Sequence, residues 1–305
     1  MVSPWGIEKG AESVANGDAS AKPLPYGLQA HTDKPFGLQP HAGKLQEVFA
    51  SVQGEGPYVG VRQAFVRLAH CHLHCAYCDT TMTTPTGGCY VQGFPTDGYP
   101  PLWYETPNPV TAETLVACLE AYHAQAPLHS VSLTGGEPLL QAEWLATHLL
   151  PLLRTTLPTV GVYLETSGTQ PHLLAKVLPW LTVVSMDVKL ASATGQPTPW
   201  QQHTAFANAC LQAETPPRLI LKAVVNETTQ PVELAPLLAW ASTLTAQQRH
   251  HTTLLIQPET RLTFQANKPL LRGTPQQWAQ HQALLLQAFS DVRIIPQVHK
   301  WLSVS

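Results

Sequence analysis

Three cysteines lie within eight residues of one another, in the run Cys71-His72-Leu73-His74-Cys75-Ala76-Tyr77-Cys78. Their spacing is Cys-x3-Cys-x2-Cys, and they follow the apolar segment Gln63-Ala64-Phe65-Val66-Arg67-Leu68. A tight loop with this spacing can place three thiolates around one inorganic centre. A closed zinc site needs a fourth protein ligand, whereas an iron–sulfur cluster held by three cysteines leaves one iron open to an outside ligand. The spacing therefore favours an iron–sulfur cluster. A zinc knuckle completed by His70, His72 or His74, and unliganded core cysteines, are the alternatives.

The segments that must position this loop alternate between two patterns. Short apolar runs rich in β-branched residues predict strands, and the segments between them carry the apolar period of helices. Strands are expected near 62–69, 129–134, 160–164, 181–187, 218–226, 252–257 and 292–298, and helices near 111–124, 140–153, 170–178, 230–246 and 275–289. Alternating strands and helices predict βαβ units and a parallel sheet, so the expected fold class is α/β, a full or partial (β/α) barrel.

Two of the predicted helices have clear start signals. Thr111 is the expected N-cap of the first, and Cys118 lies on its apolar face, which predicts a core position. The last predicted helix starts with Thr274 and Pro275, an order that suits a first helical turn. Two long segments, 81–110 and 191–217, show neither pattern and are expected to be loops.

Several other residues are expected to have no part in the chemistry. Cys89 is predicted to be an incidental exposed thiol. Packing is the expected role of Trp144, Trp240 and Trp278. Surface or helix-face positions are expected for His203, His250, His251 and His281.

Polar residues stand at the end of most predicted strands. In α/β barrels the carboxyl ends of the strands form one rim, where ligands bind. This rim would carry the cysteine loop, Thr134-Gly135-Gly136-Glu137-Pro138, Glu165-Thr166-Ser167-Gly168, Ser185-Met186-Asp187-Val188-Lys189, Gln257-Pro258-Glu259 and Gln297-Val298-His299-Lys300. Upstream of the cysteines, glycines flank Gln53 and Glu55, so a ligand can approach the backbone closely there. The carboxylate can accept hydrogen bonds from an amidine-like or aminopyrimidine edge.

The composition limits the possible partners and compartment. The chain has 305 residues, of which 44% are hydrophobic, enough for a substantial core. Only 12% are charged and the net charge is -3, which argues against nucleic acid as a partner. Three clustered and three scattered cysteines are typical of a reducing compartment. The sequence has no apolar run long enough to span a membrane and no signal-peptide pattern at its start. We therefore expect a cytoplasmic protein that does not contact membranes.

Residues 1–44 differ from the rest of the chain. They are rich in Gly, Pro, Ala and Ser and show no helical or strand period. Such a segment has little apolar surface to offset the entropy of ordering, so a mobile, disordered N-terminal extension is expected. The catalytic domain would then span residues 45–305.

Together the motifs resemble those of the 7-carboxy-7-deazaguanine synthase family of radical S-adenosylmethionine (SAM) enzymes, over about residues 45–305. The resemblance rests on Ser51-Val52-Gln53-Gly54-Glu55-Gly56, Phe65-Val66-Arg67-Leu68, the three cysteines with Asp79-Thr80, and the rim motifs that begin at 134, 165 and 297. It implies a partial (β/α) barrel of the radical SAM type, with a 4Fe–4S cluster, SAM and Mg2+ as cofactors. The implied reaction converts 6-carboxy-5,6,7,8-tetrahydropterin to 7-carboxy-7-deazaguanine with loss of ammonia. An electron donor such as a flavodoxin or ferredoxin, and a homodimer, are also implied.

The resemblance implies roles for individual residues. Arg67 suits the substrate carboxylate because its planar fork can make two charge-assisted bonds. The cluster ligands would be Cys71, Cys75 and Cys78, and the Mg2+ ligand Thr80. The substrate would contact Gln53, Glu55, Arg67, Thr134 and His299. SAM would contact Gly136, Glu137, Glu165, Thr166, Ser185, Lys189 and Gln257.

Two departures from the family pattern leave points open. The family often has Ser-Pro-Lys where this chain has Ser185-Met186-Asp187-Val188-Lys189, so it is open which of Ser185, Asp187 and Lys189 contacts SAM. Asp187 and Lys189 share a strand face, where they can pair with each other. Family members can also place a terminal carboxylate in the substrate site, and the corresponding group here belongs to Ser305. The alternatives are another radical SAM enzyme, such as a glycyl-radical activating enzyme, and a zinc-binding structural protein.

Overall fold

The computed structural model describes residues 41–78, 88–94, 102–262 and 269–302. One 10-stranded sheet forms its centre. The strands of that sheet are β2 (Leu45–Val52), β3 (Arg62–Leu68), β4 (Cys89–Gln92), β5 (Trp103–Thr106), β7 (Ser130–Gly135), β8 (Gly161–Thr166), β9 (Val183–Val188), β10 (Arg218–Val225), β11 (Thr252–Pro258) and β14 (Val292–Ile294). Two small sheets pair β1 (Ala42–Gly43) with β6 (Val110–Thr111), and β12 (Thr260–Leu262) with β13 (Pro269–Leu271). Since β1 is paired, Ala42 and Gly43 belong to the fold, just inside the predicted extension.

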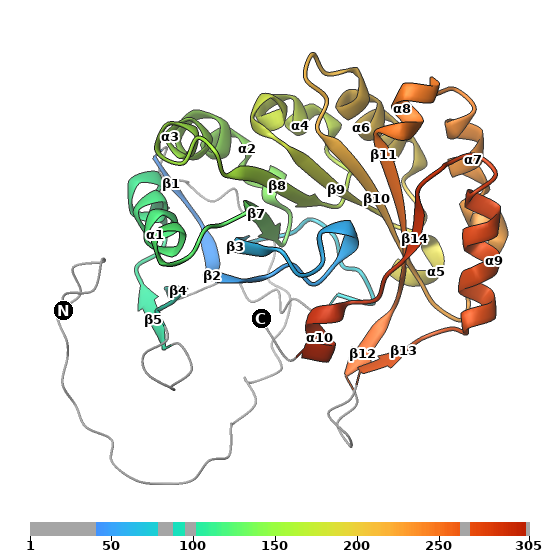
Figure 1. Ribbon diagram of the computed structural model, residues 1–305, viewed down its shortest axis with the longest axis horizontal. Coiled ribbons are helices and arrows are strands. Elements are labelled where there is room, and N and C mark those ends of the chain that lie inside the picture. The colour runs from blue at the N-terminus through green and yellow to red at the C-terminus, as the bar shows by residue number, and fades with distance from the viewer. Residues whose placement is uncertain (1–40, 79–87, 95–101, 263–268, 303–305) are drawn as a thin grey trace, which may run out of the picture.

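The strand order of the large sheet is β14-β11-β10-β9-β8-β7-β3-β2-β4-β5. From β3 to β14 all neighbouring strands are parallel, whereas β2 runs antiparallel to β3. The sheet curves into an open barrel with helices along its outer side (Figure 1). The predicted α/β partial barrel is confirmed, and the β2–β3 hairpin adds an antiparallel start to it.

The helices are α1 (Ala112–Gln125), α2 (Ala142–Trp144), α3 (Leu150–Thr156), α4 (Pro171–Val177), α5 (Ala191–Thr194), α6 (Trp200–Gln212), α7 (Ala235–Ala241), α8 (Ala246–His250), α9 (Pro275–Leu285) and α10 (Val298–Leu302). Single turns are η1 (Gly56–Tyr58), η2 (Pro138–Gln141), the π-helical η3 (Leu145–Leu149), η4 (Leu178–Trp180) and η5 (Pro231–Leu234). Thr111 caps α1 by accepting a hydrogen bond from Thr114 N, and Thr274 caps α9 ahead of Pro275. Both predicted helix starts are confirmed.

Both segments predicted to be loops contain regular structure. β4 and β5 form an antiparallel pair within 81–110, and α5 and α6 fill much of 191–217. The prediction of an exposed Cys89 is wrong, because the residue lies fully buried in the core shared with α1. Of the surface or helix-face positions predicted for His203 and His281, the helix-face alternative is confirmed: they lie on α6 and α9, and both are buried. Cys118 is buried as predicted.

The core divides into an outer and an inner part. Most buried apolar side chains lie between the sheet and its helices. A much smaller cluster of Tyr163, Val183, Ile220 and Leu255 is separate from it, and Tyr58 and Ile295 pack against this cluster. These four residues come from β8, β9, β10 and β11, and they form an apolar floor inside the barrel. Above that floor, toward the carboxyl ends of the strands, the inner face carries polar side chains, among them Glu165, Asp187, Lys222 and Gln257.

Candidate active site at the barrel rim

Strand register brings the predicted site residues side by side. Glu47 on β2 is aligned with Arg67 on β3, and Arg67 with Thr134 on β7. On the other side of the barrel, Asp187 on β9 is aligned with Lys222 on β10. Aligned residues on neighbouring strands face the same side of a sheet, so these side chains share the inner face of the rim.

Gln53, Thr134 and Glu165 form one hydrogen-bonded group. The Gln53 side chain is buried, and its Nε2 donates to Glu165 Oε1 and to Gln63 Oε1, each at 3.0 Å. Thr134 Oγ1 donates to Glu165 Oε2 at 2.7 Å. Two predicted substrate contacts therefore meet a predicted SAM contact, and Glu165 on β8 binds both of them.

Four alternating charges line the opposite wall. Lys222 Nζ lies 2.5 Å from Glu55 Oε2 and 3.0 Å from Asp187 Oδ1, while Lys189 Nζ lies 2.7 Å from Asp187 Oδ2. The expected pairing of Asp187 with Lys189 is confirmed. The formal charges of Glu55, Lys222, Asp187 and Lys189 cancel, which allows the group to remain charged away from water.

The ionisation of this group follows from its pairing. Burial by itself raises the pKa of Glu55 and Asp187, but the lysines outweigh it and hold the pKa of both carboxyls below its usual range. Burial lowers the pKa of Lys222 and Lys189, and Asp187, their strongest charged partner, more than reverses that effect. All four groups are therefore ionised near neutral pH.

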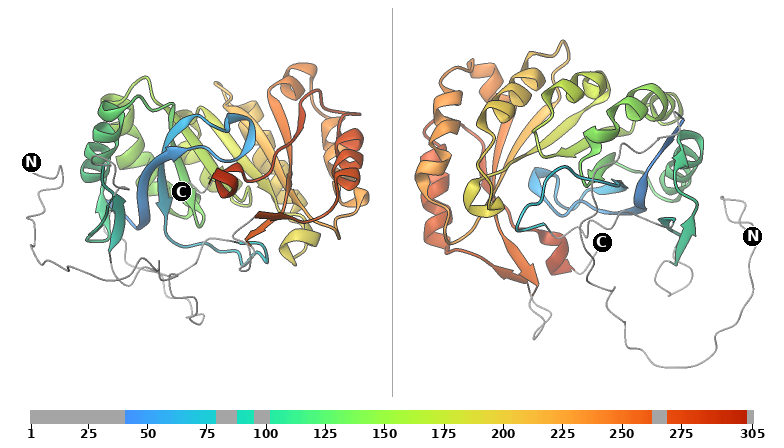
Figure 2. Two further views of the ribbon diagram at one scale, coloured as in Figure 1. Left: turned by 60° about the horizontal axis from the view of Figure 1, so that its bottom comes forward. Right: turned by 180° about the vertical axis from the view of Figure 1, so that it is seen from behind.

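The short helix α10 closes one side of this wall. Gln297 Nε2 donates to Glu55 Oε1 at 2.8 Å, and Val298 N donates to Gly54 O at 2.8 Å. A Cβ atom on Gly54 would lie only 2.4 Å from His299 Nδ1, so the glycine is what lets His299 lie against this turn. Figure 2 shows α10 beside the loop that follows β2. The predicted residues Glu55 and His299 are thus brought together.

Arg67 lies near Thr134 on the β3 side of the rim. Its Nε donates to Glu47 Oε1 at 2.6 Å, and its guanidinium carbon lies 6.0 Å from the centre of the Phe49 ring. A carboxylate on one side and an aromatic face on another restrict the rotamers of this long side chain.

The cysteine loop is tied to the rim at three points. Ala76 N donates to Thr194 O at 3.1 Å, and the ring nitrogen Nε2 of His72 lies 2.7 Å from Thr169 Oγ1. Lys189 Nζ donates to the hydroxyl of Tyr77 at 2.9 Å. The loop is therefore anchored to the segments that follow β8 and β9.

The donor set of this loop fits an iron–sulfur cluster. Cys71 and Cys75 are partly buried, Cys78 is exposed, and none forms a disulfide. Within the described ranges no three His, Cys, Asp or Glu side chains converge on a single ion. A cluster does not need such a point, because each of its cysteines binds a different iron. Burial raises the pKa of the Cys71 and Cys75 thiols, so cluster binding must displace their protons. Thr80, the predicted Mg2+ ligand, and Ser305 lie outside the described residues.

The loop after β7 packs directly on the cysteine loop. Gly136 N donates to Leu68 O at 3.1 Å, and a Cβ atom on Gly136 would lie 1.9 Å from His70 O. Only glycine allows this approach, which leaves the backbone of residue 136 beside the start of the cysteine loop.

Glu137 is fully buried, and protein groups surround its carboxylate. It accepts hydrogen bonds from Leu139 N, Thr166 Oγ1, Ser167 N and Ser167 Oγ, at 2.6 to 3.1 Å. Glu137 and Thr166, both predicted to contact SAM, are thus bonded to each other. This arrangement makes the carboxylate a brace between the loops that follow β7 and β8.

Two further predicted SAM contacts are buried on the inner strands. Ser185 on β9 hydrogen-bonds the hydroxyl of Tyr163. Gln257 on β11 is aligned with Val224, which faces the same side as Lys222. Among the described residues, Gln257 Oε1 is a buried acceptor with no hydrogen-bond partner. Such an atom is costly to bury unless a ligand supplies a donor.

Two contributors to the site were missed from the sequence. Lys222 carried a usable signal, since it is the one charged residue between Arg218 and the end of a buried strand. His203 on α6 carried none. Its Nε2 accepts from Lys189 N at 3.0 Å and its Nδ1 donates to Gly168 O at 3.2 Å. This neutral tautomer clamps the ends of β8 and β9 together, and burial lowers the pKa of His203 to about 4.

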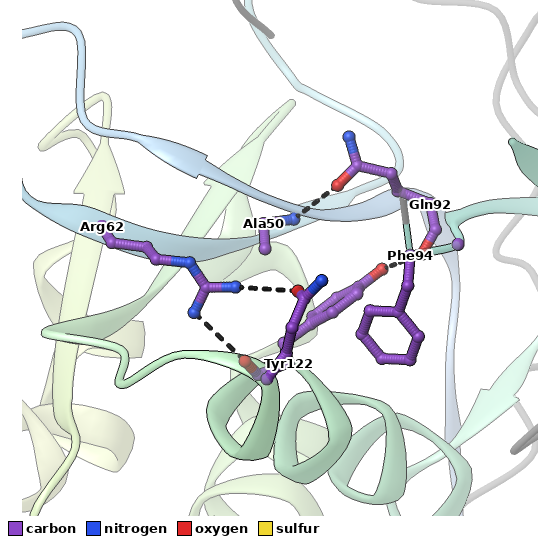
Figure 3. Close-up of a pocket in the computed structure, with 7 residues that line it drawn as sticks. Ala50, Arg62, Gln92, Phe94 and Tyr122 are labelled. Atoms are coloured by element: carbon purple, nitrogen blue, oxygen red, sulfur yellow. Dashed lines mark hydrogen bonds between the residues drawn. The ribbon is translucent and has the colours of Figure 1, made fainter. Parts of the chain in front are cut away.

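A separate hollow of about 220 Å3 lies between β2, β4 and α1 (Figure 3). Its polar groups serve the fold. Arg62 donates to the carbonyl oxygens of Tyr122 and Ala126 at the end of α1, and the Tyr122 hydroxyl donates to Gln92 O. None of the predicted site residues lines it.

Comparison with known proteins decides the family. The radical SAM superfamily profile matches residues 66–195, which include the cysteine loop. A 7-carboxy-7-deazaguanine synthase from Geobacter sulfurreducens is 36% identical over 263 residues, which cover 85% of this chain and 96% of that protein. The chain belongs to the 7-carboxy-7-deazaguanine synthase family. Another 7-carboxy-7-deazaguanine synthase, from Methanothermobacter thermautotrophicus, is 29% identical over 85% of this chain and 97% of its own length. The crystal structure of QueE from Escherichia coli matches 85% of this chain and 95% of its own with a TM-score of 0.48 and 19% identity.

Membership of the 7-carboxy-7-deazaguanine synthase family confirms the resemblance inferred from the motifs. It also argues against the two alternatives, a zinc-binding structural protein and a glycyl-radical activating enzyme. In the parts of the chain that the structure describes, no helix is long and apolar enough to cross a membrane.

Proposed function

We propose that this chain converts 6-carboxy-5,6,7,8-tetrahydropterin to 7-carboxy-7-deazaguanine with loss of ammonia. The observation that carries the proposal is the rim itself: a three-cysteine loop beside a pocket wall that offers one guanidinium, an ionised carboxylate and buried amide groups. The relative from Geobacter sulfurreducens, which bears the synthase name, matches the chain over almost its whole length.

In this proposal Cys71, Cys75 and Cys78 hold a 4Fe–4S cluster next to bound SAM. When bound, this pair of cofactors supplies the 5′-deoxyadenosyl radical that takes a hydrogen from the substrate. The protein supplies orientation and charge, as in other cofactor-dependent enzymes. Tyr77, hydrogen-bonded to Lys189, keeps the cysteine loop in register with the end of β9.

SAM contacts are assigned to residues on four strand ends. The backbone at Gly136 and the side chain of Gln257 are the strongest candidates. Gly136 lies against the start of the cysteine loop, and Gln257 Oε1 is a buried acceptor without a partner among the described residues. Lys189, held by Asp187, is the cation of this pocket, and Ser185 and Glu165 complete it. We assign Glu137 and Thr166 to positioning, because they bond each other.

Substrate recognition is assigned to both walls of the rim. Arg67 would bind the substrate carboxylate, with its direction fixed by Glu47. Gln53, Glu55, Thr134 and His299 would contact the pterin ring, and Glu55 would accept from its aminopyrimidine edge. Thr80 would give an oxygen ligand to Mg2+, which favours such ligands and bridges to substrate oxygens. A flavodoxin- or ferredoxin-like reductant, a homodimer and a cytoplasmic location complete the proposal.

The test is turnover by anaerobically reconstituted enzyme. The full chain with bound iron and sulfide would be incubated with the tetrahydropterin, SAM, a reductant and Mg2+, and the products separated by mass. We expect 7-carboxy-7-deazaguanine together with ammonia. An intact cluster that cleaves SAM without forming the deazaguanine would overturn the proposed substrate.

A further inference from the structure

Lys222 is the feature of the rim that neither the motifs nor the proposed function uses. It is nine-tenths buried, on β10, between Ile220 of the apolar floor and the open rim. A lone ammonium at such a position would be strongly destabilising, so its carboxylate partners are a requirement of the fold. Two different carboxylates meet it there, Glu55 at 2.5 Å and Asp187 at 3.0 Å.

The two partners of Lys222 have different roles. Asp187 has a second cation, Lys189, at 2.7 Å, whereas Lys222 is the one ammonium within salt-bridge distance of Glu55 in the described ranges. Losing Lys222 would therefore leave Asp187 paired and Glu55 without its counter-charge. The effect of Lys222 is thus directed toward the side of the site that we assign to substrate.

The carboxylate of Glu55 has acceptor capacity that the described residues leave unused. Oε2 accepts from Lys222 and Oε1 accepts from Gln297 Nε2, so within the described residues each oxygen accepts one side-chain hydrogen bond. A carboxylate has about four lone-pair sites, so one further acceptor position remains on each oxygen. Two adjacent acceptor positions match two adjacent N–H donors, such as the ring N–H and the exocyclic amino group of a 2-aminopyrimidin-4-one.

We propose that Lys222 is a specificity-determining residue that acts through Glu55: it keeps this carboxylate charged and fixed, so that the pocket selects a ring edge with two neighbouring N–H donors. The inference deepens the proposed function and rests on its assignment of Glu55. A protonated Glu55 would present a donor of its own and would tolerate an edge with a carbonyl acceptor. With Lys222 in place that form is disfavoured, because the ammonium stabilises the ionised carboxylate.

The test compares two substrates in reconstituted holoenzyme. One is 6-carboxytetrahydropterin, and the other is its 2-oxo analogue, in which a carbonyl replaces the amino group. For Lys222→Met we expect kcat/KM with the pterin to fall at least 30-fold and the preference for the amino over the oxo edge to shrink at least 10-fold. The affinity for SAM should stay within about 3-fold, because Asp187 keeps Lys189. Lys176→Met removes an exposed lysine paired with Glu143 and should change none of these values.

A pH profile separates this role from simple packing. In the wild-type enzyme kcat/KM for the pterin should show no ionisation of Glu55 between pH 6 and 9. In Lys222→Met kcat/KM should depend on pH and rise as the pH increases, because burial raises the pKa of Glu55 and the ammonium that opposes this effect is gone. Lys222→Arg retains a cation and should keep a flat profile even if its KM is higher.

Each outcome has one meaning. Absence of deazaguanine from the wild-type enzyme would count against the proposed function. If the wild-type enzyme forms the deazaguanine and Lys222→Met has the same preference for the amino substrate and the same pH profile, the proposed role of Lys222 is wrong. Equal losses of SAM and pterin affinity would also overturn it. If Lys222→Met does not fold, the charge-balanced double variant Lys222→Met/Glu55→Gln replaces it; retention of the amino preference there would overturn the proposal.

Discussion

Arg67 Nε lies 2.6 Å from Glu47 Oε1, at aligned positions of the first two strands of the barrel. The pair is partly exposed to the rim, so it contributes little to stability. Its effect is to restrict the position of the guanidinium on the inner face of the rim, where Thr134 on β7 is the aligned neighbour of Arg67.

Replacing Arg67 with alanine should impair substrate binding far more than SAM cleavage. Loss of two charge-assisted bonds to a carboxylate corresponds to a fall of about 100-fold in kcat/KM for the pterin. Steady-state kinetics and a separate assay of reductive SAM cleavage would measure this. Arg154→Ala, on the exposed side of α3, is the matched control. Unchanged kinetics in Arg67→Ala would refute the carboxylate assignment.

Glu137→Gln should destabilise the protein and weaken SAM binding together. The new amide would direct N–H groups at donors that now bond the carboxylate, which costs about 2–4 kcal/mol at a fully buried site. Denaturant unfolding and a SAM titration would show both losses. Glu143→Gln, at the exposed position of α2, should leave stability within about 0.5 kcal/mol of the wild type. Direct SAM contact without a structural role would instead leave unfolding unaltered.

Cys75→Ala should abolish cluster binding while the fold persists. Two cysteines cannot hold the cluster in the way three do, and Cys75 is tied into the loop between the other two. Iron and sulfide analysis with the visible absorption spectrum would give the result. Cys118→Ala, in the core of α1, should keep its iron. Full iron content in Cys75→Ala would contradict the assignment of the loop.

Thr80→Ala should raise the Mg2+ concentration needed for half-maximal turnover by about 10-fold, since one of the oxygen ligands would be lost. The measurement is activity against Mg2+ concentration at saturating SAM. Thr155→Ala, on α3, supplies the comparison. A Mg2+ dependence identical to that of the wild type would remove Thr80 from the metal site.

His203 should make stability fall as the pH decreases. Burial lowers its pKa to about 4 in the folded state, whereas the unfolded chain takes up the proton near the usual value of about 6.5. Its contribution is therefore complete above pH 6.5 and is lost progressively toward pH 4. The loss from this residue is about 1 kcal/mol between pH 7.5 and 5.5 and about 3 kcal/mol when complete.

His203→Gln tests this directly, because glutamine can replace both hydrogen bonds and does not titrate. Urea unfolding of wild type and variant at pH 7.5 and 5.5 would give the difference in slope with pH. Other buried histidines contribute equally to both proteins and cancel in the comparison. If the stability of the two proteins depended on pH in the same way, His203 would have the same protonation state in the folded and unfolded chain, and the proposed contribution would be refuted.

The repeated alternation of apolar runs and helical segments was enough to predict the parallel part of the sheet. The runs that form β7, β8, β9, β10 and β11 are mostly buried on both faces, and such strands are visible as largely apolar segments. β2 was not predicted as a strand, because Gln46, Glu47 and Ser51 interrupt its apolar pattern. α6 was not predicted as a helix, because its first residues are polar. Its buried apolar face comes later, at Phe206, Ala207, Cys210 and Leu211.

Residue types at strand ends predicted where the site would be, but not how its members are bonded. Glu137 and Glu165 are both acidic rim residues in the sequence, yet one is enclosed by four donors and the other lies between Gln53 and Thr134. Lys222 and Glu55 are 167 residues apart, so their contact depends on strand register and barrel closure. A local sequence pattern cannot predict a contact between residues that are so far apart in the chain.

The hydrogen bond from Gln297 to Glu55 joins residues 242 positions apart. The wall around Glu55, which we assign to the pterin ring, therefore becomes complete only when the β2–β3 hairpin and α10 have both packed on the barrel. Loops of that length close slowly, and contacts of such high sequence separation form late. If the proposed substrate site is correct, pterin binding would therefore report complete folding, because it depends on a contact between the two ends of the described chain.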